Sequence, residues 1–238
     1  SKGFRVGGVQ PGFSLSGPAA PEFFKSDSLW SYELGLRTQW LDRQLRADVT
    51  GFHTVWKNPQ TFQNASLTAA YIDNAGGVEN YGVETTLQAA LPWGLQFNTS
   101  AAWTDTYTTM PFQSQGGEVP SGSQWPFAPH WQTASSLTWA LPLGTWLVAP
   151  GVSYSTISDA PNNLDPSTAN KVFGYQQLDF ALAVRDTSVE WMPEFSLALN
   201  NALDERGVSN YYIGALVPTV KAVDTTYIRP RTLTLRIA

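Results

Sequence analysis

The chain has 238 residues with a net charge of −5, and 14% of its residues are charged while 13% are aromatic. Few charges combined with many aromatic residues exclude a disordered chain, and the absence of cysteine excludes disulfide frameworks and thiolate metal sites. Two histidines, His53 and His130, are too few for a multi-histidine metal centre. The acidic balance, without a basic stretch, argues against nucleic-acid binding.

Strict alternation of apolar and polar residues begins over residues 31–41 and continues over residues 45–50. A period of two predicts β-strands rather than helices. The polar segment 42–44 between the two runs predicts a tight hairpin turn.

The same alternation returns along the rest of the chain, over residues 81–89, 95–103, 131–141, 146–154, 177–185, 195–200 and 232–237. We therefore expect about ten strands, several of them near the length of roughly 10 residues that crosses a bilayer when tilted. Short turns are expected near residues 42–44, 92–94, 142–144 and 186–190, and long loops near residues 11–28, 58–77, 107–128, 157–171 and 204–224. Short connections on one side and long ones on the other are typical of an outer-membrane barrel.

The two faces of these strands differ in chemistry. One face is apolar and almost free of charge, with Trp and Tyr near the strand ends, as at Trp40 and Trp103, which favours contact with lipid. The opposite face is predicted to line a hydrated lumen and carries Arg37, Arg46, Asp48, Glu84, Asp179, Arg185 and Arg236. A soluble antiparallel sandwich also alternates and remains the alternative from the pattern alone.

No catalytic motif is present. The sequence lacks a G-x-S-x-G element, a phosphate-binding loop and an H-E-x-x-H helix. Glu79 and Glu84 are five residues apart on one predicted strand, so they lie on opposite faces and cannot form a hydrolytic carboxylate pair. We predict no catalytic residues, no metal site, no cofactor and no enzyme activity.

Five segments carry recognisable motifs in a fixed order, at residues 1–8, 30–37, 74–84, 200–206 and 230–232. Their sequences are SKGFRVGG, WSYELGLR, NAGGVENYGVE, NNALDER and PRT. Together they resemble the C-terminal half of the barrel of TonB-dependent outer-membrane receptors. The resemblance implies an all-β fold, an antiparallel transmembrane β-barrel segment of about ten strands that is part of a barrel of about 22 strands.

The resemblance also sets expectations for organisation. Residues 1–238 would be the C-terminal portion of the receptor barrel, with the plug domain and the N-terminal strands outside this sequence. The family normally ends in an aromatic residue, whereas this sequence ends at Ala238. An open sheet leaves two unpaired edges, which lipid does not tolerate, so we expect the segment to need the remaining barrel strands, on the same chain or on a partner chain.

The implied function is uptake of a bulky, scarce nutrient across the outer membrane of a Gram-negative cell, with iron–siderophore complexes as the expected substrate class. Expected partners are outer-membrane lipid, lipopolysaccharide and, through the plug, the TonB complex. Loop aromatics would contact the ligand, and the candidates are Trp125, Phe127, Tyr211 and Tyr212. Two alternatives stay open: a structural barrel subunit of a larger envelope complex that has lost transport, and a ten-stranded outer-membrane barrel enzyme such as the omptin proteases.

Overall fold

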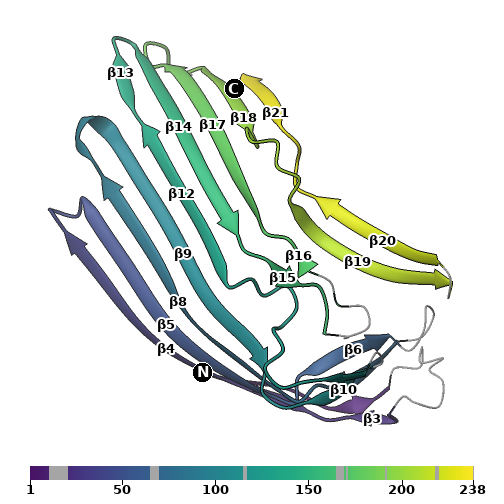
Figure 1. Cartoon of the computed structure of the whole chain (residues 1–238). Coiled ribbons are helices and arrows are strands. Elements are labelled where there is room, and N and C mark those ends of the chain that lie inside the picture. Colours follow the sequence, from purple (N-terminus) through teal and green to yellow (C-terminus); the bar gives the residue numbers. More distant parts are fainter. Residues whose placement is uncertain are drawn as a thin grey trace.

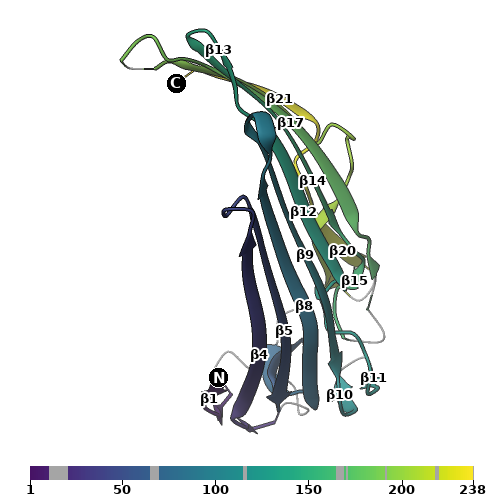
Figure 2. The ribbon, with the colours of Figure 1, turned by 90° about the vertical axis from the view of Figure 1, so that its left-hand side faces the viewer.

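One long antiparallel sheet forms the body of the molecule and is bent into an open, curved wall (Figure 1 and Figure 2). The computed structural model describes residues 1–10, 21–64, 70–114, 117–164, 169, 171–190, 192–217 and 220–237. Among the described residues, no helix has the length and apolar character needed to cross a membrane.

The main sheet has 11 strands, and the order of the strands across the sheet follows their order in the sequence. In sheet order the strands are β1 (Lys2–Arg5), β4 (Asp27–Trp40), β5 (Leu45–Lys57), β8 (Gly77–Ala90), β9 (Leu95–Thr108), β12 (Trp131–Trp139), β14 (Trp146–Ile157), β17 (Tyr175–Asp186), β18 (Glu194–Asn200) and β21 (Thr232–Ile237), with β13 (Leu141–Leu143) paired to β14. The predicted strands are confirmed, although β4 begins four residues before the predicted start because it continues toward the loops.

The short turns gather at the upper end of the wall in Figure 1. The predicted turn between β4 and β5 closes with a hydrogen bond of 2.9 Å from the Gln44 amide to the Leu41 carbonyl. Three consecutive residues, Leu41, Asp42 and Arg43, adopt positive φ values of 51°, 51° and 70°. Between β8 and β9 a single 3₁₀ turn, η1 (Pro92–Gly94), makes the reversal.

At the lower end, the segments expected to be long loops contain strands of their own. The two-stranded sheets pair β2 (Gly8–Val9) with β3 (Phe23–Phe24), β6 (Gln60–Asn64) with β7 (Ala70–Asn74), β10 (Phe112–Ser114) with β11 (Gly117–Val119), β15 (Ala160–Pro161) with β16 (Lys171–Val172), and β19 (Val208–Val217) with β20 (Val220–Tyr227). These strands were not predicted, because most of them are too short for alternation to be visible in the sequence.

The apolar face of the main sheet is exposed rather than packed. Leu34 is 83% exposed and Leu235 is 69% exposed, although they lie near opposite ends of the strand order. Every other sheet among the described residues has only two strands. A sandwich would bury these side chains between two sheets. The exposed apolar face therefore excludes the soluble sandwich and fits a wall that faces lipid.

The sheet does not close on itself within the described residues. Its first strand, β1, pairs only with β4, and its last strand, β21, pairs only with β18. Each outer edge therefore presents free backbone amides and carbonyls, which require partners inside a bilayer.

Gly82 in β8 sits where two strands and a ring crowd together. A Cβ at this position would lie 2.3 Å from the Trp103 carbonyl oxygen and 2.7 Å from the Phe52 ring. The Gly82→Ala substitution is expected to destabilise the fold by about 1–3 kcal/mol, because backbone and ring must both shift. Urea unfolding of the protein in lipid vesicles measures the loss.

Gly51 on the adjacent strand is the matched control, since the nearest atom to its Cβ is 4.0 Å away. The Gly51→Ala variant is expected to change the free energy of unfolding by no more than about 0.5 kcal/mol. Equal effects of the two substitutions would contradict the close packing at Gly82.

Candidate functional site

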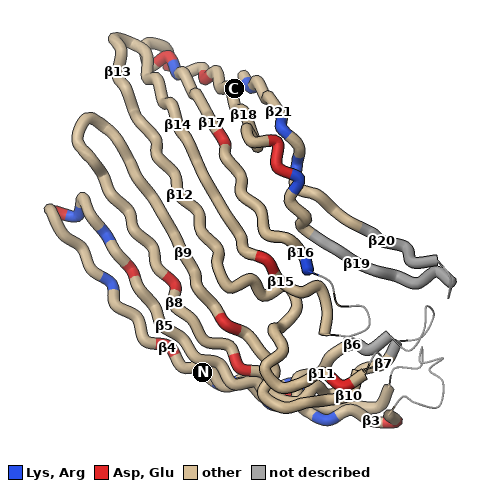
Figure 3. Tube along the Cα trace, in the orientation of Figure 1, with Lys and Arg blue, Asp and Glu red and all other residues tan. Residues whose placement is uncertain are grey.

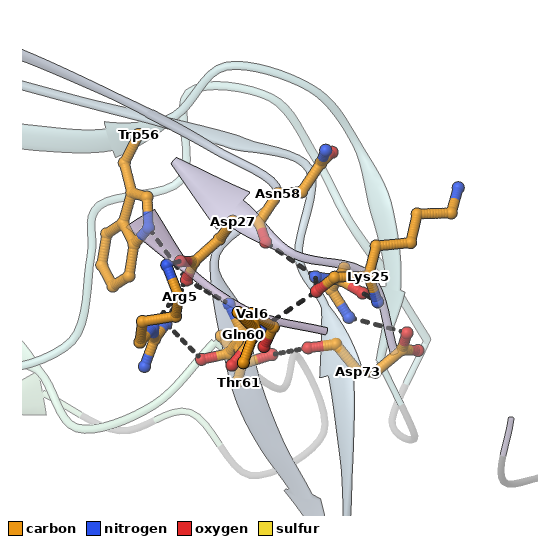
Figure 4. A network of polar contacts seen from close by, with 10 residues as sticks. Arg5, Val6, Lys25, Asp27, Trp56, Asn58, Gln60, Thr61 and Asp73 are labelled. Atoms are coloured by element: carbon orange, nitrogen blue, oxygen red, sulfur yellow. Dashed lines mark hydrogen bonds and ion pairs between the residues drawn. The ribbon is translucent and has the colours of Figure 1, made fainter. Parts of the chain in front are cut away.

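A buried carboxylate organises the loop end of the wall, where β1, β4 and β5 meet (Figure 4). The side chain of Asp27 is only 2% exposed. Its Oδ1 accepts a hydrogen bond of 3.0 Å from the Arg5 amide, and its Oδ2 accepts one of 2.8 Å from Arg5 Nε. A second guanidinium nitrogen of Arg5 also pairs with Oδ2. Trp56 Nε1 at 3.2 Å and the Gln60 amide at 3.3 Å complete the set of donors.

This arrangement keeps Asp27 charged. Burial alone would raise the pKa of the carboxyl, but the hydrogen bonds from Arg5, Gln60 and Trp56 and the charge of Arg5 together hold that pKa below its usual value. A buried carboxylate with this many donors is fixed in position. Asp27 therefore anchors the start of β4 to the strands on both sides.

A second set of contacts ties the bases of the loops to one another (Figure 4). The side chain of Gln60 donates to the Val6 carbonyl at 2.9 Å and to the Lys25 carbonyl at 3.0 Å. The side chain of Asn74 donates to the same Lys25 carbonyl at 3.0 Å and to the Asn58 carbonyl at 2.7 Å. Asn74 opens one of the motifs found in the sequence, and its role here is to fasten three loop segments together.

Two indole rings meet beside this network. The rings of Trp56 and Trp125 lie 6.0 Å apart, and the Arg5 guanidinium stands 5.3 Å from the centre of the Trp56 ring. The Trp125 amide donates to the Thr106 carbonyl at 2.7 Å, which holds this loop residue against the end of β9. Trp56, Trp125 and Arg5 thus form a cluster of aromatic and cationic side chains, called the rim below. The predicted ligand residue Trp125 belongs to this rim.

Of the other predicted ligand residues, Phe127 is the one whose side chain lies in the described part of the chain. Phe127 adopts a φ of 53° and is 49% exposed, and its amide donates to the Pro161 carbonyl at 2.9 Å. Tyr211 and Tyr212 lie on the backbone of β19, and their side chains lie outside the described part of the chain. Their contact with a ligand stays a prediction.

The charged residues predicted to share one face do so in the observed register. Arg37 pairs with Asp48 across β4 and β5, with Nε at 3.2 Å from Oδ1, and Arg46 Nη2 lies 2.9 Å from the other oxygen of Asp48. Arg185 contacts Glu194 with Nε at 3.2 Å. The remaining members are Glu84 and Arg236, which are exposed, and Asp179, which accepts hydrogen bonds from Gln177 and from the Asn201 amide.

The middle of this face is neutral and made of small side chains. Strands β12 and β14 carry no charged residue and are tan along their whole length in Figure 3. A shallow hollow of about 390 Å³ crosses β8, β9, β12 and β14, and its polar-face side chains are Thr86, Asn98, Ser100, Ala134, Ser136, Ser153 and Ser155. Short hydroxyl side chains let another surface approach the wall closely. Sequence reasoning missed this surface because it concentrated on charge.

The apolar face is not free of charge at its loop end. The register aligns Glu79 and Asp105 with the outward residues of β8 and β9, so the expectation of a nearly charge-free face is wrong there. His53 Nε2 lies 3.4 Å from Glu79, and His130 Nδ1 lies 3.7 Å from Asp105. Within the described ranges, no three His, Cys, Asp or Glu side chains converge in a way that could hold a metal ion.

Comparison with known proteins identifies the family to which this fold belongs. Residues 1–202 match the family described as TonB dependent receptor-like, beta-barrel. Among curated proteins, none matches the sequence.

Solved structures share the architecture. The ferric yersiniabactin uptake receptor FyuA from Yersinia pestis superposes with a TM-score of 0.72 at 18% identity, covering 99% of this chain and 33% of that chain. BauA, the ferric preacinetobactin receptor from Acinetobacter baumannii, gives 0.67 at 17% identity, covering 99% and 32%. The copper transporter OprC gives 0.62 at 16% identity, covering 90% and 31%. The chain therefore spans about a third of the length of these structures, and the likeness shows the fold.

Proposed function

Because this chain belongs to the TonB-dependent receptor family through its β-barrel domain, we propose that it forms part of the wall of an outer-membrane receptor for a ferric siderophore complex. The observation that carries the proposal is the sheet itself, whose exposed apolar face alternates residue by residue with a polar, partly charged face. Lipid would cover the first face and a hydrated lumen the second. The ferric siderophore receptors among the similar structures support the substrate class.

The parts of the structure divide the work of such a receptor. The loop end, with the Trp56–Trp125 pair and Arg5, would meet a bulky ligand that carries both aromatic and anionic groups. The Asp27 network would keep the loop bases in place while the ligand binds. The small-residue hollow on the polar face would lie against a plug domain, through which the TonB complex would act. The remaining strands of the barrel would satisfy the edges at β1 and β21.

Uptake of radiolabelled iron tests this function. Iron-starved cells that make the full-length receptor are compared with cells that lack it, with the iron supplied as ferric complexes of catecholate and hydroxamate siderophores in turn. We expect accumulation that needs both the receptor and a working TonB complex. Accumulation that is the same with and without the receptor, for every complex, would contradict the proposal.

Trp125 is the ligand candidate that the structure ties to the rim. The Trp125→Ala substitution is expected to weaken binding of the transported complex at least about tenfold, which corresponds to about 1.4 kcal/mol. Equilibrium binding of the labelled complex to whole cells measures the change. Phe173 is the control, because it is a loop aromatic that is 69% exposed and outside the rim. Equal losses in Trp125→Ala and Phe173→Ala would argue against the rim as the binding site.

A further inference from the structure

A second cavity lies outside the rim, beside the Asp105–His130 contact on the apolar face. It is a cleft of about 990 Å³ between the loop ends of β9 and β12 and described residues in and beside β15 and β16. Ligand pockets in proteins typically occupy about 300–1,000 Å³. The residues that line the cleft include Trp103, Asp105, Gln124, His130, Trp131 and Lys171.

The register places this cleft on the apolar side of the wall. Trp103 pairs with Val83 on one neighbouring strand and with Trp131 on the other, and Val83 is an exposed residue of the apolar face. Asp105 is two residues further along β9 and therefore shares the face of Trp103. The cleft thus opens outward, near the loop end of the wall, rather than toward the polar face.

Two indole rings form its apolar surface. The Trp103 and Trp131 rings lie 6.5 Å apart at an angle of 54°, and Trp131 is 54% exposed. An exposed, rigid indole offers a flat surface on which the C–H face of a sugar ring can stack, at little cost in side-chain entropy.

The polar groups around these rings are mainly hydrogen-bond acceptors. His130 Nδ1 lies 2.9 Å from the Thr104 carbonyl oxygen, which can only accept, so this nitrogen carries the proton and Nε2 of the neutral ring is an acceptor. Asp105 accepts a hydrogen bond of 3.0 Å from the Tyr81 hydroxyl on one oxygen, and a carboxylate has further acceptor capacity. Gln124 donates through its nitrogen to the Ala128 carbonyl at 2.7 Å, which leaves its oxygen as an acceptor.

The charges in the cleft do not suit an anion. Lys171 forms an ion pair with Asp159, so these two charges offset each other. The backbone amide of Gly174 and the Lys171 side chain together lower the pKa of Asp159, which keeps this carboxyl ionised and paired. Besides this ion pair, the cleft is lined by one further carboxylate, that of Asp105. A phosphate or carboxylate ligand would be repelled, whereas hydroxyl groups would find acceptors.

We propose that this outward cleft binds an uncharged hexose-type sugar, which stacks on Trp131 and donates hydroxyl hydrogen bonds to Asp105 and His130. The sugar could belong to the lipopolysaccharide around the receptor or to a free oligosaccharide. Lipopolysaccharide as the source of the sugar depends on the proposed outer-membrane setting. The shape and the hydrogen-bonding groups of the cleft do not depend on that proposal. The site is separate from the ligand rim around Trp125.

Calorimetric titration of the purified full-length receptor in detergent tests the proposal, with a neutral glucose trisaccharide as one probe and lipopolysaccharide with a complete sugar core as the other. We expect binding of at least one probe, weakened at least tenfold in both Trp131→Ala and Asp105→Ala. Trp146→Ala is the matched control, because Trp146 is an exposed indole at the opposite end of the wall. It should bind like the unmodified receptor. Migration of unheated and heated samples on gels confirms that each variant is folded.

The outcomes distinguish lipopolysaccharide from a free oligosaccharide as the source of the sugar, and they separate sugar binding from iron uptake. Binding of the trisaccharide assigns the cleft to free glycans, and binding of lipopolysaccharide alone assigns it to the surrounding membrane. No binding of either probe, or binding that folded Trp131→Ala and Asp105→Ala retain unchanged, would overturn the proposal. Iron uptake by the unmodified receptor is a separate readout, so a failure here leaves the proposed transport function standing.

Discussion

Arginine in place of Leu182 is expected to destabilise the barrel by about 2–4 kcal/mol, the cost of a charged side chain near the middle of the lipid-facing surface. Leu182 lies in the second half of β17, pairs with Pro150 on one side and Leu197 on the other, and is 40% exposed on the apolar face. In lipid, the guanidinium of the introduced arginine would have no hydrogen-bond or ion-pair partner. Urea unfolding of the full-length receptor in lipid vesicles, followed by tryptophan fluorescence, measures the loss.

The neighbouring residue provides the control. Ala181 is exposed on the opposite face and pairs with Gly151 and Ala198, both of which leave room for a longer side chain. The Ala181→Arg variant is expected to lose less than about 1 kcal/mol, because water and neighbouring polar groups can solvate the charge. If the two arginines cost the same, the apolar face is not the face that meets lipid.

Replacing Asp27 by asparagine is expected to cost about 2–3 kcal/mol at neutral pH, in the range for hydrogen bonds to charged groups that are left unmade in a buried site. The loss of stability is not expected to be larger, because the side chain of Arg5, the main partner of Asp27, is 51% exposed and can be solvated by water. Trp56 and Gln60, the other two donors, are half-buried. The same unfolding experiment, supplemented by limited proteolysis of the loops, measures both the stability and the opening of the loop end.

The effect of this substitution is expected to depend on pH with a defined sign. The folded pKa of Asp27 lies below the ordinary value of about 3.9, so its contribution is complete above that value and is lost as the pH falls through the folded pKa. The difference between the unmodified receptor and Asp27→Asn should therefore shrink below about pH 4.

Asp204 is the comparison for this prediction. Its carboxylate accepts one hydrogen bond of 3.2 Å from the Arg231 amide, its ion pair with the Arg231 guanidinium is 3.8 Å long, and both side chains are more than 40% exposed. Asp204→Asn should change stability by no more than about 1 kcal/mol. A cost as large as that of Asp27→Asn would mean that burial of the carboxylate does not set the effect.

Much of the wall follows from local pattern. Alternation over residues 31–41 and 81–89 defines which side chains share a face, and antiparallel pairing of strands joined by short turns then brings Arg37 opposite Asp48. The period of two fixes the register because a slip by one residue would turn every apolar side chain to the wrong face. For the same reason, the charged residues of the polar face could be predicted one by one, although the neutral hollow on that face was missed.

The loop end could not be predicted in this way. Asp27 gathers donors from Arg5, Trp56 and Gln60, which lie 22, 29 and 33 residues away in the sequence. The outward cleft similarly joins Trp103, Trp131 and Lys171 from separate segments. Such contacts depend on how irregular segments fold back on the sheet, and the alternation of apolar and polar residues in the sequence does not predict how they fold. The small hairpins were missed for the related reason that most are too short to show a pattern.

The intact mass of the native polypeptide, extracted from the outer membrane, tests most directly whether this chain is the wall of a complete receptor. We expect a mass near three times 26.1 kDa, because the chain covers 33% of FyuA and its sheet has an unpaired strand at each edge. A native mass near 26.1 kDa would contradict this expectation. Closure of the sheet would then have to come from partner chains, and a structural role in an envelope assembly would replace uptake.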